Sequence, residues 1–234
     1  IWQTTRRPYV ILKMASTLDG RIAAGAGRAE AVTNASSREE VMRFRRDIAL
    51  AGGAVLIGGN TFFLDDPRLT ARTGGAEKQP LAAVVTSRLP GADRKFHLTE
   101  ERPGDCVFFS SAAQAASPAA AALRNRGARV HVSDRCADGK FLDLNQVLET
   151  LREKENCFYV YCEGGGRMAL SLLESGLVDE LHMHYSPVIL GDSESTPVFY
   201  GRSVSSMQEA LRMRVVKTTV VDGDVHLYFR PEAR

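Results

Sequence analysis

Short apolar runs recur along the first two thirds of the chain. The run YVILKMA at Tyr9–Ala15 is long enough for one buried strand. Runs of the same kind predict further strands at Ala54–Ile57, Leu81–Thr86, Val107–Ser110, Arg129–Val132 and Cys157–Cys162. Because these runs are apolar throughout and do not alternate with polar residues, they are typical of parallel strands that are covered on both faces.

Segments with a helical spacing of apolar residues lie between these strands. They are Ser37–Arg46 behind a cap at Ser36 or Ser37, Pro118–Asn125 behind Ser117, Asn145–Lys154, and Arg167–Ser175. Strands that alternate with helices in this way indicate an α/β protein.

The last quarter of the chain has a different pattern. Glu180–Tyr185, Leu211–Val221 and Asp224–Phe229 are extended segments, and no convincing helix separates the last two. Asp222-Gly223 between them is a favoured hairpin turn, because glycine takes a positive φ without penalty. The sequence therefore predicts an α/β fold in one domain over residues 1–234, with a mixed, mainly parallel sheet and a C-terminal antiparallel hairpin.

Composition and charge narrow the function classes. The 234 residues are 44% hydrophobic and 25% charged, and the net charge is +2 without a long block of like charge. A sequence with this charge balance has no basic cluster of the kind that binds nucleic acid or an anionic membrane surface. The longest apolar stretch, Ala49–Ile57, is far shorter than the roughly 20 residues that a bilayer span requires. Because the first residues also lack a signal-peptide pattern, we expect a cytoplasmic protein.

The residues that most often bind metals give no metal signature. The four cysteines show no CxxC pair and no zinc-like spacing, so we interpret them as core or surface residues, with a catalytic thiol as the alternative. His182 and His184 stand two apart in an extended segment and could share a metal, but alternating surface positions are the simpler interpretation. We therefore expect no metal.

A glycine-rich turn follows the strand that ends at Cys162. Glu163 and Gly164–Gly166 stand between this strand and the next helix. A helix start without Cβ atoms exposes backbone N–H groups, so that a phosphate or pyrophosphate can approach closely. A tight turn without a ligand is the alternative. The acidic residue at the strand end favours a ligand, because open α/β sheets bind ligands at that edge.

Glycines also follow a second strand. Gly58 and Gly59 come after Ala54–Ile57 and precede a short helix that contains Thr61. Two glycine-bearing strand ends suit a dinucleotide better than a mononucleotide. The alternative is that these glycines only permit close packing of the following helix.

Charged side chains crowd the segment after that helix. Asp65 and Asp66 precede Pro67, and Arg68 and Arg72 stand four residues apart. Two arginines beside carboxylates could grip a substrate phosphate while an aspartate orients ribose or nicotinamide. A solvated loop is the alternative.

Lys13 stands inside an otherwise apolar strand, near the polar turn at Leu18–Arg21. A buried lysine is costly unless it is paired or takes part in chemistry. A lysine that extends to solvent from an edge strand is the alternative.

Five motifs, in the same order, resemble the reductase domain of riboflavin biosynthesis, which is the RibD C-terminal family. They are Arg7-Pro8-Tyr9-Val10 through Leu18-Asp19-Gly20-Arg21, Asp65-Asp66-Pro67-Arg68-Leu69-Thr70, Glu163-Gly164-Gly165-Gly166, Leu177-Val178-Asp179-Glu180-Leu181 and Pro187-Val188-Ile189-Leu190-Gly191. The resemblance spans Arg7–Phe229. It implies a fold like dihydrofolate reductase, in three αβα layers around the mixed sheet, and a homodimer.

The resemblance also implies an activity and a set of site residues. NADPH would deliver a hydride to C1′ of the ribosyl group of a 5-phosphoribosylamino-pyrimidine and yield the ribitylamino product. The candidate catalytic residues are Lys13, Asp65 and Glu163. The coenzyme would contact Gly58, Gly59, Thr61, Asp65, Ser87, Arg88, Gly164, Gly165, Gly166, Arg167 and Met168, with Arg88 at the 2′-phosphate by inference from its place at a strand end. The substrate would contact Arg45, Leu69, Arg72 and Glu163, and its phosphate would meet the arginines.

The chain departs from the family at Arg28–Val32, where many relatives carry a serine and an aromatic residue. This departure leaves the exact substrate open. The zinc-deaminase signatures of bifunctional relatives are absent as well, so the chain cannot deaminate by that route. The alternatives are a reductase of a pterin or secondary metabolite and a non-catalytic nucleotide-binding module. The choice between NADPH and NADH, the oligomeric state and a preceding domain stay open.

Overall fold

A computed structural model gives the structure of the chain and describes residues 6–25, 31–72, 78–136 and 141–232. The chain divides into two compact units. The first unit contains Ile1–Tyr9 and Met42–Tyr161, and the second contains Val10–Val41 and Cys162–Arg234. The single domain expected from the sequence therefore stays a prediction.

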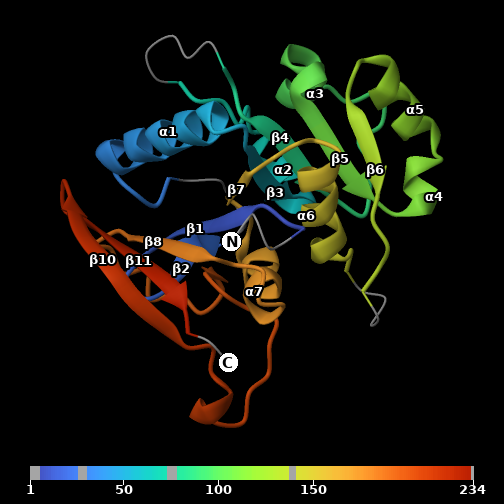
Figure 1. Cartoon of the computed structure of the whole chain (residues 1–234). Coiled ribbons are helices and arrows are strands. Elements are labelled where there is room, and N and C mark those ends of the chain that lie inside the picture. Colours follow the sequence, from blue (N-terminus) through green and yellow to red (C-terminus); the bar gives the residue numbers. More distant parts are fainter. Residues whose placement is uncertain (1–5, 26–30, 73–77, 137–140, 233–234) are drawn as a thin grey trace. The chain divides into compact units, whose positions relative to one another are not determined.

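Parallel strands form the sheet of the first unit. In spatial order they are β7 (Tyr159–Cys162), β3 (Ala54–Gly58), β4 (Leu81–Val85), β5 (Cys106–Ser110) and β6 (Arg129–Val132). The pairs β3–β4, β4–β5 and β5–β6 are parallel, and Figure 1 shows their ribbons side by side. Every residue of β5 is buried, as a continuous apolar run predicts. Parallel strands place their carboxyl ends at one edge, so the residues that follow β3, β4 and β5 share that edge.

Short helices connect these strands. They are α2 (Gly59–Asp65), α3 (His97–Glu101), α4 (Ala112–Ala115), α5 (Pro118–Asn125) and α6 (Leu144–Glu153), with a 3₁₀ turn at Pro103–Asp105. The predicted cap of α5 is confirmed, because Ser117 accepts a hydrogen bond from the Ala120 N–H. Helix α6 is capped by Asp143 and buries Leu148 and Leu151, as its spacing predicts. Helix α2 packs on β3 and β4.

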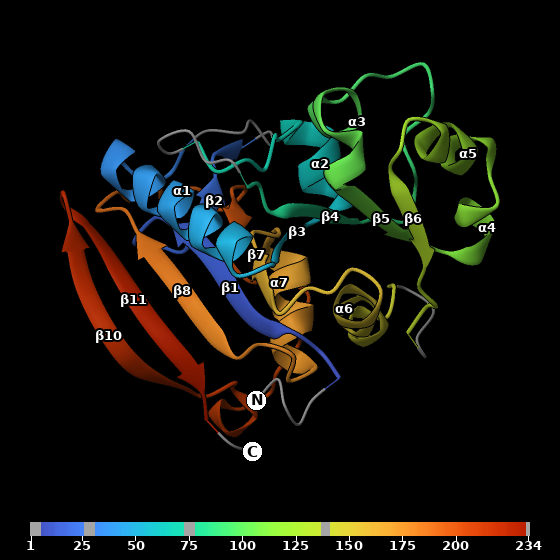
Figure 2. The same ribbon diagram turned by 45° about the horizontal axis from the view of Figure 1, so that its top comes forward.

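The second unit holds the antiparallel part of the sheet. Its strands, in spatial order, are β10 (Met213–Val221), β11 (Asp224–Pro231), β8 (Glu180–Tyr185) and β1 (Tyr9–Ser16). Figure 2 shows the four ribbons side by side. The β1–β8 pair is parallel, whereas β8–β11 and β10–β11 are antiparallel. The unit also contains α7 (Gly166–Glu174), a 3₁₀ turn at Met207–Glu209, and the small pair β2 (Arg21–Ala23) and β9 (Thr196–Pro197).

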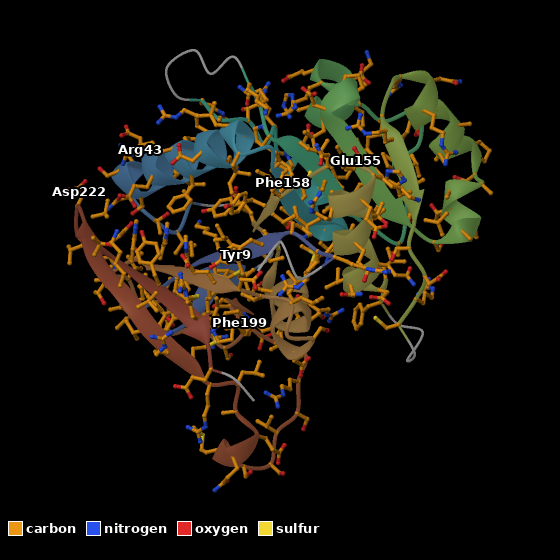
Figure 3. All side chains as sticks on the ribbon, viewed as in Figure 1. Tyr9, Arg43, Glu155, Phe158, Phe199 and Asp222 are labelled. Atoms are coloured by element: carbon orange, nitrogen blue, oxygen red, sulfur yellow. The ribbon has the colours of Figure 1, made fainter. Side chains whose placement is uncertain are left out.

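The predicted hairpin turn is confirmed. Asp222 lies at the tip between β10 and β11 (Figure 3), and both Asp222 (φ 51°) and Gly223 (φ 92°) have positive φ. Positive φ at both central residues is the requirement of the type I′ turn. The α/β fold with a mixed, mainly parallel sheet, here of nine strands, is confirmed with it.

The predicted cap of the first long helix is wrong. Helix α1 spans Ala35–Leu50, and the Oδ1 atom of Asn34 accepts a hydrogen bond from the Ser37 N–H at 2.8 Å. Ser37 instead donates its hydroxyl to Asp224 at 2.7 Å, in the second unit. Asn34 precedes two serines that are equally good caps, so only the tertiary partner of Ser37 decides between them.

None of the helices in the described ranges has both the length and the apolar character needed to cross a bilayer.

Candidate functional site

The turn between β3 and α2 brings the first predicted glycines to the sheet edge. Gly58 is the N-cap of α2 and supplies no side-chain cap, so the first N–H groups of this helix have no capping partner from Gly58. A Cβ atom on Gly59 would overlap Thr86 Oγ1 and lie 2.8 Å from Thr86 Cβ. Gly59 is therefore required for the close approach of α2 to the end of β4, and Thr61 lies half-buried two residues further on.

The end of β4 places two more predicted coenzyme residues at the same edge. Ser87 and Arg88 are both exposed. The Arg88 guanidinium lies 4.7 Å from the centre of the Phe63 ring, a cation–π distance. Thr86 donates its hydroxyl to the Arg88 carbonyl at 2.7 Å, which closes the turn. Arg88 is thus a charged group held in one direction at a strand end, while its terminal nitrogens stay accessible.

The loop after α2 carries the predicted substrate residues of the first unit. Asp65 ends the helix, and partial burial of its carboxylate raises its pKa although the residue as a whole is exposed. Leu69 is 2% exposed, and Arg72 is exposed. Arg45 projects from α1, is 8% exposed, and donates to the Thr70 carbonyl at 3.1 Å. The structure therefore brings Arg45 to the loop that holds Leu69 and Arg72.

Arg68, one of the predicted pair of phosphate-binding arginines, already has a carboxylate partner, and its role toward a ligand stays a prediction. Its guanidinium makes a bidentate ion pair with Glu101 of α3, with two N–O distances of 2.9 Å. Its charge is already neutralised by a carboxylate that nothing in the sequence marks as a partner. Arg45 and Arg72 stay the predicted arginines for the substrate phosphate.

The second glycine turn starts α7. A Cβ on Gly166 would lie 2.5 Å from the Val198 carbonyl oxygen, and one on Gly164 would overlap Met168 Cε. A Cβ on Gly165 would meet nothing within 4 Å. Gly165 is the N-cap of α7 and makes no side-chain capping bond. Gly166 is thus required by packing against backbone, whereas a Cβ on Gly164 would displace only the flexible end of Met168. Gly165, between them, faces open space at an uncapped helix start, where an anion can approach.

Three further candidates lie around this turn. Glu163 is half-buried directly after β7. Met168 is half-buried, and Arg167 is exposed with its guanidinium 5.3 Å from the centre of the Tyr200 ring. Glu163 is the one carboxylate that the chain places directly before the α7 turn.

Lys13 lies half-buried in β1, opposite His182 of β8 in the parallel register. The surface position expected for His182 and His184 is wrong, because each is 1% exposed. The His184 ring stacks on His226 with 3.6 Å between centroids. Burial, followed by the charge of Lys13, lowers the pKa of His184 to about 2, so this ring is neutral. The alternation of β8 is real, but its polar face is covered by the chain.

The buried thiols do not form a nucleophilic site. Burial raises the pKa of Cys106, Cys157 and Cys162 to about 12 in each case. Cys136 is exposed and makes a long contact with the Leu142 carbonyl. Across the described ranges, no three His, Cys, Asp or Glu side chains gather as metal ligands would. The departure at Arg28–Glu30 lies outside the described residues.

Thr86, Gln79, Glu101 and Arg102 contribute to these surroundings and were not foreseen. Gln79 accepts from the Ala71 N–H at 2.8 Å, and Arg102 donates to the Leu69 carbonyl at 3.3 Å. These residues are distant in sequence from the loop that they hold, and no local motif marks them.

The mixed, mainly parallel sheet defines an α/β protein with a fold like dihydrofolate reductase. The chain matches the family described as the RibD C-terminal domain over residues 8–227, and it belongs to that family. This family match confirms the resemblance drawn from the motifs.

Two curated relatives illustrate the match. One is the 2,5-diamino-6-ribosylamino-4(3H)-pyrimidinone 5′-phosphate reductase of Methanothermobacter thermautotrophicus, to which the chain is 30% identical over 220 residues. The aligned region covers 94% of this chain and 96% of that protein. The chain is 28% identical over 232 residues to the riboflavin biosynthesis protein RibD of Actinobacillus pleuropneumoniae, covering 95% of this chain and 57% of that protein. The chain thus spans less than two thirds of this RibD relative's length.

Solved structures agree on the fold. RibD of Acinetobacter baumannii superposes with a TM-score of 0.80 at 26% identity, over 98% of this chain and 60% of that one. A dihydrofolate reductase from Enterococcus faecalis superposes with a TM-score of 0.50 at 10% identity, over 96% and 97% of the two chains. The latter comparison bears on the fold alone.

Proposed function

We propose that this chain reduces the ribosyl group of a 5-phosphoribosylamino-pyrimidine to the ribitylamino product, with NADPH as hydride donor, in riboflavin biosynthesis. The observation that carries the proposal is the start of α7 at Gly165, which makes no side-chain capping bond and has open space where a Cβ would point. Such a helix start is a ready anion site and suits a phosphate group of the coenzyme. Membership of the reductase family and the named activity of the archaeal relative support the same reaction.

When bound, NADPH would supply the hydride that C1′ of the ring-opened imine takes up, and the residues of the site would deliver a proton to the adjacent nitrogen. Lys13, Asp65 and Glu163 are the proposed groups that hold or move protons at the reacting atoms. The raised pKa of Asp65 favours a carboxyl group that can exchange a proton closer to neutral pH. Gly58, Gly59, Thr61 and the α7 turn would hold the coenzyme. Arg45 and Arg72 would bind the substrate phosphate.

The proposal is tested with purified protein, NADPH and NADH, and a panel of phosphorylated pyrimidines and pterins. Oxidation of NADPH that depends on the 5-phosphoribosylamino-pyrimidine is the expected result. Turnover only with a pterin or another metabolite would instead support a related reductase. Coenzyme binding without turnover on any substrate would identify a non-catalytic nucleotide-binding module.

Arg88 provides the test of coenzyme preference. We expect Arg88→Ala to weaken NADPH binding about tenfold and to leave NADH binding unchanged, because a charge-assisted contact to the 2′-phosphate is lost. Binding is measured by titration of each coenzyme. Arg94→Ala is the matched control, since Arg94 also lies over aromatic rings, 4.6 Å from the Phe96 centroid. Equal losses for NADPH and NADH would assign Arg88 a purely structural role.

A homodimer that covers β10 is part of the proposal, as is a cytoplasmic location. Strand β10 is the last strand in the sheet order and exposes Val220 at 70% and Val215 at 53%. An edge strand of nine residues that exposes valines is a template for pairing with a second chain. We expect light scattering to give twice the 25.6 kDa chain mass, and Val220→Lys to give the monomer mass. Val132→Lys on β6, which ends the opposite edge of the strand order and is 48% exposed, is the control. A monomeric unmodified protein contradicts the dimer.

A further inference from the structure

Two buried guanidinium groups lie beneath the loop that carries Leu69 and Arg72. Arg45 is 8% exposed, and the Arg102 side chain is 9% exposed. Arg45 donates to the Thr70 carbonyl at 3.1 Å, and Arg102 donates to the Leu69 carbonyl at 3.3 Å. Arg102 also donates to the Pro80 carbonyl. Consecutive carbonyls of one loop are therefore held by two separate arginines.

The charge of Arg102 is poorly compensated. Its ion-pair partner, Asp105, lies 3.9 Å away and is 62% exposed. Its Nε atom is buried and has no hydrogen-bond partner. Burial lowers the pKa of Arg102, the charges of Asp105 and Cys106 raise it, and the positive charge of Arg45 lowers it again. Buried charge with incomplete pairing is destabilising, and an anion above the loop would offset that cost.

The loop itself is held in a conformation that its sequence disfavours. Leu69 has φ 49°, in the left-handed region that a leucine rarely occupies. Such strain persists only where the surroundings fix it, and it gathers at ligand sites. Here the surroundings do so: Gln79 bonds both the N–H and the carbonyl of Ala71, and Glu101 holds Arg68. Arg102 completes this set of bonds at Leu69.

We propose that Arg102 is a positioning residue of the phosphate site, which holds the Leu69 backbone in its left-handed conformation and adds positive potential beneath Arg72. The inference rests on the proposed function, in which Arg45 and Arg72 bind the substrate phosphate. Arg102 acts through the loop backbone and not by contact with the phosphate. Loss of Arg102 should therefore lower the affinity for the phosphate group and leave the rate of the chemical step unchanged.

The probe is inorganic phosphate, titrated calorimetrically against the intact protein. We expect Arg102→Gln to weaken phosphate binding at this site about tenfold, and Arg102→Lys to weaken it less, because lysine keeps the charge but not the fork that reaches two carbonyls. Arg124→Gln is the matched control, because Arg124 also bridges two backbone carbonyls, those of Ala115 and Val130, in the same unit. It should bind phosphate as the unmodified protein does. In steady-state kinetics KM for the phosphorylated substrate should rise about tenfold in Arg102→Gln, with kcat unchanged.

Circular dichroism melting shows which variants are folded. Unchanged phosphate affinity in folded Arg102→Gln overturns the inference, as does a fall in kcat with unchanged KM. If Arg102→Gln does not fold, the test uses Arg102→Lys. Weaker phosphate binding by this variant than by the unmodified protein supports the inference, and unchanged binding overturns it. Phosphate binding that needs Arg102, in a protein that reduces no pyrimidine, would defeat the proposed function and leave this inference standing. Pyrimidine reduction with a KM that does not change in the Arg102 variants would support the proposed function and overturn this inference.

Discussion

Glu163→Gln is expected to lower kcat about 10²- to 10⁴-fold while the dissociation constant of NADPH changes less than about threefold. Glutamine keeps the size of the side chain and its hydrogen-bonding oxygen, but it cannot carry a proton. Glu163 is half-buried and follows β7 directly, next to the α7 turn. Stopped-flow turnover and coenzyme titration measure the two quantities separately.

Glu174→Gln is the control for this substitution. Glu174 ends α7 in the same unit, and its carboxylate is 42% exposed beside Arg202. The exchange should leave both turnover and coenzyme affinity unchanged, because an exposed ion pair contributes little. If Glu163→Gln instead weakens coenzyme binding as strongly as it slows turnover, Glu163 places the ligand and does not take part in the chemistry.

Gly165→Ala and Gly166→Ala should separate binding from packing at the α7 turn. Gly165 has φ −69° and open space where a Cβ would point, so alanine fits the fold. A methyl group there would occupy the approach to the uncapped N–H groups, and we expect NADPH affinity to fall about tenfold or more with unfolding free energy changed by at most about 1 kcal/mol. Coenzyme titration and denaturant unfolding measure both effects.

Gly166→Ala should behave in the opposite way. The new Cβ would lie 2.5 Å from the Val198 backbone oxygen and 3.0 Å from that of Pro197. Backbone atoms cannot relieve such a contact by a change of rotamer, as a side chain can. Overpacking of this kind costs about 1–3 kcal/mol of stability. If Gly165→Ala binds NADPH normally, no pyrophosphate approaches α7 over that glycine, and the assignment of this turn to the coenzyme fails.

The regular elements were predictable because their signals are local. The apolar runs at β3 and β5, the Ser117 cap and the Asp222-Gly223 turn each express a preference that the flanking residues do not oppose. Strands β2 and β9 and helix α3 escaped prediction because each is too short to show a period. Their existence depends on partners elsewhere in the chain.

Some features of the candidate site could likewise be predicted from local sequence, and others could not. The glycines of both turns could be found from sequence, because glycine after an apolar strand has few uses. The ion pair of Arg68 with Glu101 of α3 could not be predicted, because no sequence pattern connects the two residues. Surface positions for His182 and His184 were wrong, because alternation along a strand tells which side chains share a face and not what covers that face.

The sequence by itself determined the α/β class, the strands, the hairpin turn and the two glycine-bounded helix starts. Each of these follows from residues that are neighbours along the chain, where backbone sterics and apolar spacing act directly. Only the tertiary structure decided which charges are neutralised, which histidines are buried and that Arg45 and Arg102 bind the neighbouring carbonyls of Thr70 and Leu69. Those outcomes depend on groups brought together from distant segments, whose interaction energy exists only once the chain has folded.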